Sequence, residues 1–327
     1  NLSTTGNYLR ETVQVINTFI GAYETRSWGC VITMGNDTQS GILNIPSMST
    51  YPSPGACSIY AYNESYYVNI ISTFTWGKYS GGTWFLKWCN FSSAQNTGSL
   101  WGTYMNIVGN CTFVDLTISE GSGHSTLNLN GYKIIGEDII ISTGSTFFPH
   151  GEIECNIFTD NNALTISSGQ TFILTNTTYA QISDIVISLN GILYAPSHKL
   201  YTNEFDNRFG LYIHNEGTFI LMNLNVTGSP AIMSNSNSPF YNVTTKAGIL
   251  VYQTITDIQV INNLILNSNW YCTKVIYLGN NTQSGTMNKV THNTGRIYGY
   301  NENYYATITG TISFTAYGAN IRVKWIN

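Results

Sequence analysis

The sequence has little charge and no long apolar run. Charged residues make up 9% of the 327 residues, against about 25% in ordinary soluble proteins. The 13 Lys and Arg are scattered and the formal net charge is −4, so the electrostatic pattern of a nucleic-acid-binding surface is missing. No apolar run approaches the roughly 20 residues of a membrane-spanning helix. We therefore expect neither a nucleic-acid partner nor a membrane span.

Sequence patterns of common enzyme and metal sites are also missing. The six cysteines include no Cys-x-x-Cys pair, which argues against a zinc or thioredoxin-like site. There is no Gly-x-Ser-x-Gly motif, no P-loop and no dinucleotide-binding glycine motif. The candidate carboxylate pairs for a glycosidase are Glu137-Asp138, Glu152-Ile-Glu154 and Glu204-Phe-Asp206.

These carboxylate pairs are interpreted as solvated charges at strand edges. His150 lies in phase with Glu152 and Glu154 on an expected strand, and the three could hold a divalent cation. A polar strand edge is the favoured interpretation. We predict no catalytic residue, no cofactor and no metal, and hence a protein that is not an enzyme.

The residues that are abundant favour β-strands. The chain has 23 Tyr, 14 Phe and 7 Trp, with 43% hydrophobic residues. Tyr and the β-branched residues fit pleated, half-buried surfaces, whereas Lys, Glu and Ala favour helices. We therefore predict an all-β fold. Only 17 Asp and Glu are present, so few carboxylates can be lost on acidification, and we expect tolerance of acid.

Two features predict a location outside the cell. The first residue is Asn1 and not Met, which suggests that a leader was removed, although a truncated chain would look the same. The even number of cysteines suits disulfides in an oxidising compartment, with buried free thiols as the alternative. We expect the protein at a cell or virion surface.

Nine Asn-x-Ser/Thr sequons occur, against about eight expected by chance from the composition. Apart from Asn1, we predict them as glycosylation sites: Asn36, Asn63, Asn90, Asn110, Asn176, Asn225, Asn242 and Asn280.

An internal duplication brackets the chain. Five blocks recur in the same order, which chance does not easily produce. The matched blocks are Val13–Asn17 with Ile258–Asn262, Trp28–Cys30 with Trp270–Cys272, Gly35–Gly41 with Gly279–Gly285, Ile59–Tyr67 with Ile297–Tyr305, and Lys87–Trp88 with Lys324–Trp325.

Each copy is predicted to be a small antiparallel, sandwich-like β unit. Short runs of β-formers are separated by turns such as Asn36–Gly41, whose Asn and Gly residues suit a hairpin loop. The tyrosines of each copy are either half-buried cross-strand pairs or a platform on which a sugar could stack. The candidate sugar-stacking residues are Tyr60, Tyr62, Tyr298 and Tyr300.

The middle of the chain has a different pattern. Short apolar stretches such as Leu116-Thr-Ile118 and Phe172-Ile-Leu174 alternate with corners such as Asn130-Gly131 and Asn190-Gly191. Strands and corners without helices predict a β-solenoid, with a β-sandwich as the alternative. The phrase Ile220-Leu-Met-Asn-Leu-Asn-Val-Thr-Gly228 resembles the coils of pectin-lyase-like parallel β-helix proteins. Such a resemblance implies stacked parallel coils over this central third.

The predicted organisation has three parts: repeat unit A at 1–92, a central module at 93–247 and repeat unit B at 248–327. The composition, rich in Asn, Ile, Tyr, Thr and Ser and poor in charge, resembles extracellular filament and virion surface proteins of thermoacidophilic archaea. We predict a structural or adhesive surface protein that assembles with copies of itself, in which head-to-tail contacts would give filaments. The alternatives are a carbohydrate-binding adhesin that contacts surface glycans and a polysaccharide-degrading β-helix enzyme.

Overall fold

A computed structural model describes most of the chain. The described residues are 2–4, 8–9, 12–21, 25–27, 29–45, 48–50, 55–72, 76, 82–97, 102–120, 123–222, 232–245, 251–254, 256–267, 270–288, 294–311 and 322–327. They form β-strands, turns and bends, and this part of the chain contains no helix. Two compact units are present, Asn1–Asn162 and Ala163–Asn327.

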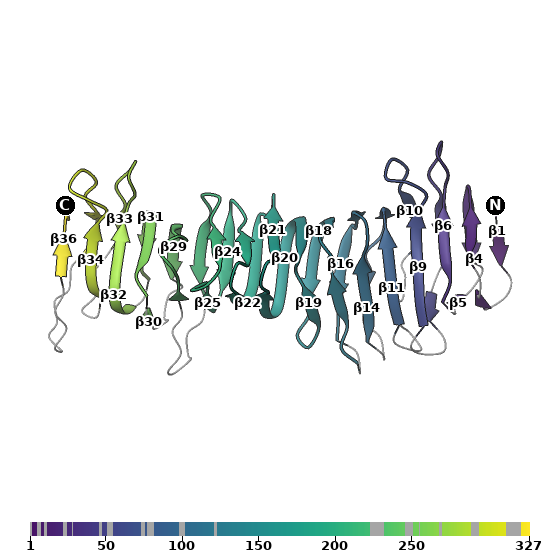
Figure 1. Ribbon diagram of the computed structural model, residues 1–327, viewed down its shortest axis with the longest axis horizontal. Coiled ribbons are helices and arrows are strands. Elements are labelled where there is room, and N and C mark those ends of the chain that lie inside the picture. The colour runs from purple at the N-terminus through teal and green to yellow at the C-terminus, as the bar shows by residue number, and fades with distance from the viewer. Residues whose placement is uncertain are drawn as a thin grey trace. The chain divides into compact units, whose positions relative to one another are not determined.

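The strands of the first unit stack in parallel turns of a solenoid and belong to three sheets (Figure 1). One sheet consists of β3 (Val13–Val15), β6 (Val31–Met34), β9 (Gly55–Ala61), β11 (Gly82–Lys87), β14 (Thr103–Ile107), β17 (Thr126–Asn128) and β19 (Thr146–Phe148). A second consists of β1 (Leu2–Thr4), β4 (Thr18–Gly21), β7 (Ile42–Asn44), β10 (Val68–Ile70), β12 (Cys89–Phe91), β13 (Gln95–Asn96), β15 (Cys111–Thr112), β16 (Asp115–Ile118), β18 (Lys133–Ile141) and β20 (Gly151–Ile166). A third consists of β2 (Tyr8–Leu9), β5 (Thr25–Ser27) and β8 (Met48–Thr50).

The strands of the second unit also pair in parallel with strands of neighbouring turns. Its strands are β21 (Thr171–Thr175), β22 (Tyr179–Ile187), β23 (Ile192–Tyr194), β24 (Lys199–Thr202), β25 (Glu204–Asp206), β26 (Leu211–Ile213), β27 (Thr218–Leu221), β28 (Ile232–Met233), β29 (Phe240–Thr245), β30 (Val251–Thr254), β31 (Ile258–Ile265), β32 (Trp270–Leu278), β33 (Thr286–Met287), β34 (Thr294–Gly299), β35 (Thr307–Ile308) and β36 (Arg322–Lys324). Within each unit the described strands form turns of a parallel β-solenoid.

The apolar residues of successive turns lie one above the other. In the first unit Ile32, Ile59, Leu86 and Ile107 occupy matching positions of β6, β9, β11 and β14, and all four are fully buried. Alternate residues of a strand face opposite sides, so the intervening polar residues face outward. A slip of one residue would move a whole column to the outside, and the buried column therefore fixes the register.

The interior of the second unit is aromatic. Phe205, Tyr212, Phe219 and Phe240 come from four different strands, and all lie at most 3% exposed. Their ring centroids lie 4.8–6.1 Å apart, mostly in edge-to-face or tilted arrangements. Burial raises the pKa of the Tyr212 hydroxyl, which stays protonated at neutral pH.

The structure confirms the all-β prediction and the solenoid, but the sandwich-like flanking units are wrong. The duplicated segments pair in parallel: β3 with β6, β6 with β9, β31 with β32 and β32 with β34. Each expected hairpin loop is instead a corner loop that connects two strands of one solenoid turn. In the second copy its base is closed by an isolated antiparallel bridge between Gly279 and Ser284. The division of the chain at residues 92 and 247 remains a prediction.

Candidate functional site

The duplicated corner loops have the same internal hydrogen bonds in both copies. The Asn36 side-chain oxygen accepts hydrogen bonds from Thr38 N, Thr38 Oγ1 and Gln39 N at 2.9–3.0 Å. In the second copy the Asn280 oxygen accepts from the matching atoms of Thr282 and Gln283 at 2.8–2.9 Å. These Asn-centred turns hold the loops in one shape.

A glycine begins each of these loops for a steric reason. Gly35 and Gly279 have φ angles of 84° and 94°, in the left-handed region. A Cβ atom on either residue would lie 2.6 Å from the backbone oxygen of the loop glutamine. The two copies therefore share their backbone geometry as well as their sequence.

A stripe of outward-facing side chains runs across the turns beside each loop. The first stripe is Gln14, Thr33, Tyr60 and Lys87, which are in register on β3, β6, β9 and β11. The second stripe is Gln259, Tyr277, Tyr298 and Lys324, in register on β31, β32, β34 and β36.

Both stripes finish on a lysine above a tryptophan. Lys87 Nζ lies 4.1 Å from the ring centroid of Trp88, and Lys324 Nζ lies 3.7 Å from that of Trp325. Each tryptophan has a positive φ, 55° and 53°, which turns the chain at the corner. A cation above an indole face is attracted by the ring quadrupole, so the two stripes match in detail.

The stripes differ at one position, where the first has Thr33 and the second has Tyr277. In the second stripe a groove of about 340 Å³ lies beside Tyr277, a size within the roughly 300–1,000 Å³ of small-molecule sites. The groove is lined by Ser236, Asp257, Ile258, Gln259, Tyr277 and Tyr300.

Polar groups hold this groove, which we call the tyrosine groove, in shape. Gln259 Nε2 donates a hydrogen bond to Gly279 O at 2.8 Å, and Asp257 Oδ1 accepts one from Val275 N at 3.0 Å. Burial, followed by the charge of Asp257 and the neighbouring Tyr298, raises the pKa of Tyr277. The Tyr277 hydroxyl is therefore neutral at physiological pH and able to donate as well as accept a hydrogen bond.

The predicted sugar-stacking tyrosines take different places in this arrangement. Tyr300 lines the tyrosine groove and is 37% exposed, and the Tyr298 ring packs against Tyr277. Tyr60 is half-buried in the first stripe beside Thr33, and the exposed Tyr62 follows it. Tyr277 was missed by sequence reasoning because its counterpart in the first copy is Thr33, although that difference between aligned copies was visible.

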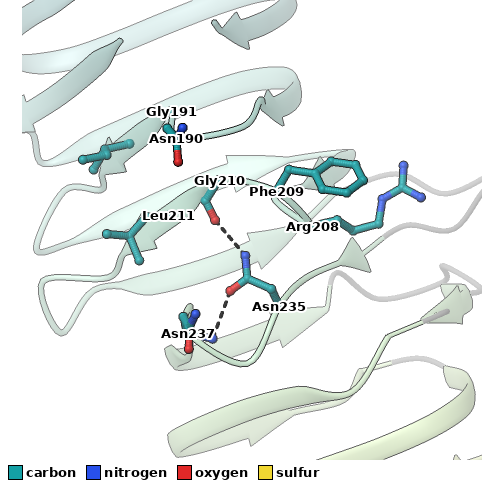
Figure 2. A pocket seen from close by; sticks show the side chains of 9 residues that line it. Asn190, Gly191, Arg208, Phe209, Gly210, Leu211, Asn235 and Asn237 are labelled. Carbon is teal, nitrogen blue, oxygen red and sulfur yellow. Dashed lines mark hydrogen bonds between the residues drawn. The ribbon is translucent and has the colours of Figure 1, made fainter. Parts of the chain in front are cut away.

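A second hollow lies on the second unit, at three successive corners (Figure 2). It has a volume of about 470 Å³ and is lined by Asn190, Gly191, Ile192, Arg208, Phe209, Gly210, Leu211, Asn235 and Asn237. Figure 2 shows the Arg208 and Phe209 side chains projecting from one corner.

The Arg208 and Asn235 side chains, which line this second hollow, form hydrogen bonds within the protein. Arg208 forms two hydrogen bonds with the carboxylate of Asp206, at 3.0 and 2.8 Å, so its charge is neutralised. The Asn235 side-chain amide donates to the carbonyls of Asn207 and Gly210 at 2.6 and 2.7 Å. The exposed ring of Phe209 remains as the apolar surface, and we rank this hollow below the tyrosine groove.

The carboxylates considered for catalysis have structural partners. Lys133 Nζ lies 2.8 Å from Glu152 and 2.5 Å from Glu154. Burial lowers the pKa of Lys133, but the hydrogen bonds and charges of the two glutamates outweigh it, and the pKa is raised. The ammonium group occupies the position that a divalent cation bound by these glutamates would take.

The other two carboxylate pairs lie on outer strand faces. Glu204 stands in register with Asp184, and Asp206 is paired with Arg208. Asn156 Nδ2 donates to Glu137 at 3.1 Å. In the described part of the chain, no group of three His, Cys, Asp or Glu side chains is placed to hold a metal ion.

The predicted glycosylation sites are unequally accessible. Asn110 and Asn176 are exposed, whereas the side-chain amide of Asn90 donates to Asn69 at 3.0 Å. Asn242 accepts hydrogen bonds from the amides of Asn262 and Asn263. Asn36, Asn63 and Asn280 are half-buried on the corner loops. Asn1 and Asn225 lie outside the described residues.

The fold defines the class of this protein as a parallel β-solenoid. A membrane-spanning helix is missing among the residues that the structure describes. Comparison with protein-family models, with curated proteins and with solved structures gave no match to this chain.

Proposed function

We propose that this protein is an extracellular structural and adhesive surface protein whose solenoid units present side-chain stripes to carbohydrate. The observation that supports the proposal best is the tyrosine groove beside Tyr277 and Tyr300. A tyrosine ring offers an apolar face on which the C–H groups of a sugar can stack, and its hydroxyl can bond to a sugar hydroxyl. Gln259 and Asp257 add polar groups at the same groove.

A stiff solenoid suits an adhesive role for a physical reason. The outward residues of successive turns are held about 4.8 Å apart by the backbone ladder, so a stripe is preorganised and loses little conformational entropy on binding. The first stripe lacks the Tyr277 ring but keeps the remaining side chains. Two related stripes on one chain would raise the avidity for a polymeric glycan.

The test uses an array of neutral and acidic oligosaccharides probed with the whole chain and with Tyr277→Ala. We expect the whole chain to bind a defined subset of glycans and the variant to lose most of that binding. Tyr104→Ala serves as the matched control, since Tyr104 is exposed on β14 and belongs to neither stripe. Absence of binding to any glycan, or equal binding by both variants, would refute the carbohydrate proposal.

Self-association is the second candidate function, and it rests on strand β36. Val323 is in register with Ile297, and Ile297 with Ile276. Both isoleucines are fully buried, whereas Val323 is 56% exposed. An apolar side chain that continues a buried column favours a covering layer, and a strand edge can pair with another chain. We propose a second copy of this chain as the occupant.

Light scattering and negative-stain microscopy test the self-association. The whole chain should form oligomers or regular assemblies, and Val323→Lys should shift it to the monomer. Val186→Lys is the control, because Val186 is also partly exposed but faces outward on β22. A whole chain that remains monomeric at high concentration would overturn this second candidate and leave the carbohydrate proposal untouched.

A further inference from the structure

Two cysteines meet on neighbouring turns of the first unit. Val31 of β6 is in register with Ser58 of β9, so the preceding residues, Cys30 and Cys57, are neighbours as well. Ser58 N donates a hydrogen bond to Cys30 O at 2.9 Å. The two sulfur atoms are 2.8 Å apart, and the residues are 1% and 0% exposed.

A second pair lies on another sheet of the same unit. Asn90 of β12 is in register with Thr112 of β15, which makes Cys89 and Cys111 neighbours. The Cys111 thiol is near enough to the Cys89 thiol to raise its pKa. Cys89 Sγ also donates to Ile59 O at 3.4 Å. Both cysteines are buried.

The spacing of a parallel ladder suits a disulfide between such neighbours. In-register Cα atoms on adjacent strands lie about 4.8 Å apart, inside the roughly 4.4–6.8 Å range of disulfides. On the neighbouring described strands, the register sets other residue types opposite the remaining two cysteines. Cys155 faces Gly136, and Cys272 lies between Thr254 and Thr294.

We propose that Cys30 bonds to Cys57 and Cys89 to Cys111, and that these two disulfides join neighbouring turns of the first unit. The inference rests on the extracellular location in the proposed function, because disulfides persist in oxidising compartments. The oxidant is a small-molecule disulfide such as oxidised glutathione. Two protein S–H bonds and the glutathione S–S bond break, while one protein S–S bond and two glutathione S–H bonds form, so electrons and protons balance.

Burial decides when this exchange takes place. Burial raises the pKa of the Cys89 thiol well above its ordinary value, and the neighbouring Cys111 thiol raises it further. The reactive thiolate is therefore scarce once the turns have closed. The disulfides form while the turns are still opening and closing during folding, and the folded chain then shields them from reductants.

Trypsin separates the possible pairings, because the spacing of Lys and Arg places each proposed pair within one peptide. Residues 27–78 contain Cys30 and Cys57, and residues 88–133 contain Cys89 and Cys111. Cys155 and Cys272 fall singly in residues 134–199 and 247–274. The experiment refolds the whole chain in glutathione redox buffer, alkylates it in denaturant without reductant and measures the peptide masses.

The expected result is that peptides 27–78 and 88–133 remain unalkylated and are each two hydrogens lighter than the dithiol. Peptides 134–199 and 247–274 should each carry one alkyl group. Alkylated cysteines in the first two peptides, or a cross-link between them, would overturn the pairing. Cys57→Ala should leave Cys30 alkylated and peptide 88–133 unchanged.

Stability gives an independent readout that keeps location and pairing apart. Unfolding in the presence of a strong reductant should lower the melting temperature by about 5 °C or more. Cys155→Ala should show the same lowering of the melting temperature by reductant. The double variant with Cys57→Ala and Cys111→Ala should show no such lowering, and that result would support the pairing. If refolding forms both disulfides but protein from its native source carries thiols, the extracellular location fails while the pairing holds.

Discussion

The rings of Tyr277 and Tyr298 meet edge to face, with centroids 5.9 Å apart and an interplanar angle of 74°. They belong to neighbouring strands, β32 and β34, and are in register. In the first copy of the duplication the matching pair is Thr33 and Tyr60, also in register. The chain therefore contains its own comparison between a stripe with two aromatic rings and a stripe with one.

Exchange of the two residues tests whether the ring matters for binding. Tyr277→Thr should weaken binding of the best oligosaccharide by about tenfold, since a lost ring contact costs roughly 1 kcal/mol or a little more. Thr33→Tyr should leave binding at the second stripe intact and add affinity at the first. Isothermal titration of each variant measures both effects. No change in either variant would show that the stripes do not bind the sugar.

The aromatic interior of the second unit predicts a large difference between two phenylalanines. Phe219 is 1% exposed and packs against Phe205, Tyr212 and Phe240. Phe219→Ala should lower the free energy of unfolding by about 3–5 kcal/mol because it leaves a cavity. Phe209 is 65% exposed, and Phe209→Ala should change it by no more than about 0.5 kcal/mol. Urea unfolding checks both values, and similar losses would contradict the arrangement.

The strands could be predicted from the sequence, but their partners could not. Alternating apolar residues mark strands such as β11 and β27 in either pairing. A Gly-and-Asn loop such as Gly279–Gly285 fits a hairpin as well as a solenoid corner. Its local antiparallel bridge even copies the base of a hairpin. A hairpin and a solenoid corner differ only in which strands pair, and in the solenoid the paired residues are about twenty positions apart. Local residue propensities contain no information about such distant pairing.

The candidate site was predicted only in part for the same reason. Tyr298 and Tyr300 were found because their block recurs around Tyr60 and Tyr62. Tyr277 lies on β32 and Asp257 directly before β31, and both reach the groove only through the stacking of turns. The cysteine pairs were hidden likewise, since an even count of cysteines contains no information about which turns meet.

Two carboxylates in register on the second unit predict a response to pH. Asp184 and Glu204 lie on β22 and β25. Burial raises the pKa of both, and the charge of Asp184 raises that of Glu204 further. A raised folded-state pKa stabilises the protein at low pH, and this stabilisation is lost as the pH rises through the raised pKa.

Removing one of these charges should therefore be favourable at neutral pH. Both groups are partly solvated, so Glu204→Gln should raise the free energy of unfolding by about 0.5 kcal/mol at pH 7. The gain should vanish near pH 3.5, where the carboxylates are protonated. Glu302→Gln, in an exposed loop, is the control and should show neither effect. Chemical denaturation at the two pH values measures the difference, and a destabilised Glu204→Gln at pH 7 would contradict it.

Asp160 predicts a stronger pH effect in the first unit. It is 1% exposed, and burial raises its pKa to about 6, against the opposing hydrogen bonds from Asn162 N and Nδ2 at 3.0 and 3.1 Å. The folded state thus binds a proton more tightly than the unfolded chain, whose carboxyl pKa is near 3.8. The contribution of Asp160 to stability is complete below pH 4 and is lost between pH 4 and pH 6.

Asp160→Asn keeps the shape of the side chain and its acceptor oxygen while removing the charge. At pH 7 the variant should unfold with a free energy higher by on the order of 3 kcal/mol, and at pH 4 it should match the parent protein. Thermal melts between pH 4 and pH 7.5 check this, with the parent melting higher at the acid end and the variant changing less. If Asp160→Asn had the same stability as the parent protein at every pH, the assignment of the pH effect to Asp160 would be refuted. If the parent protein lost stability steeply on acidification, the acid tolerance expected from the small number of carboxylates would be refuted as well.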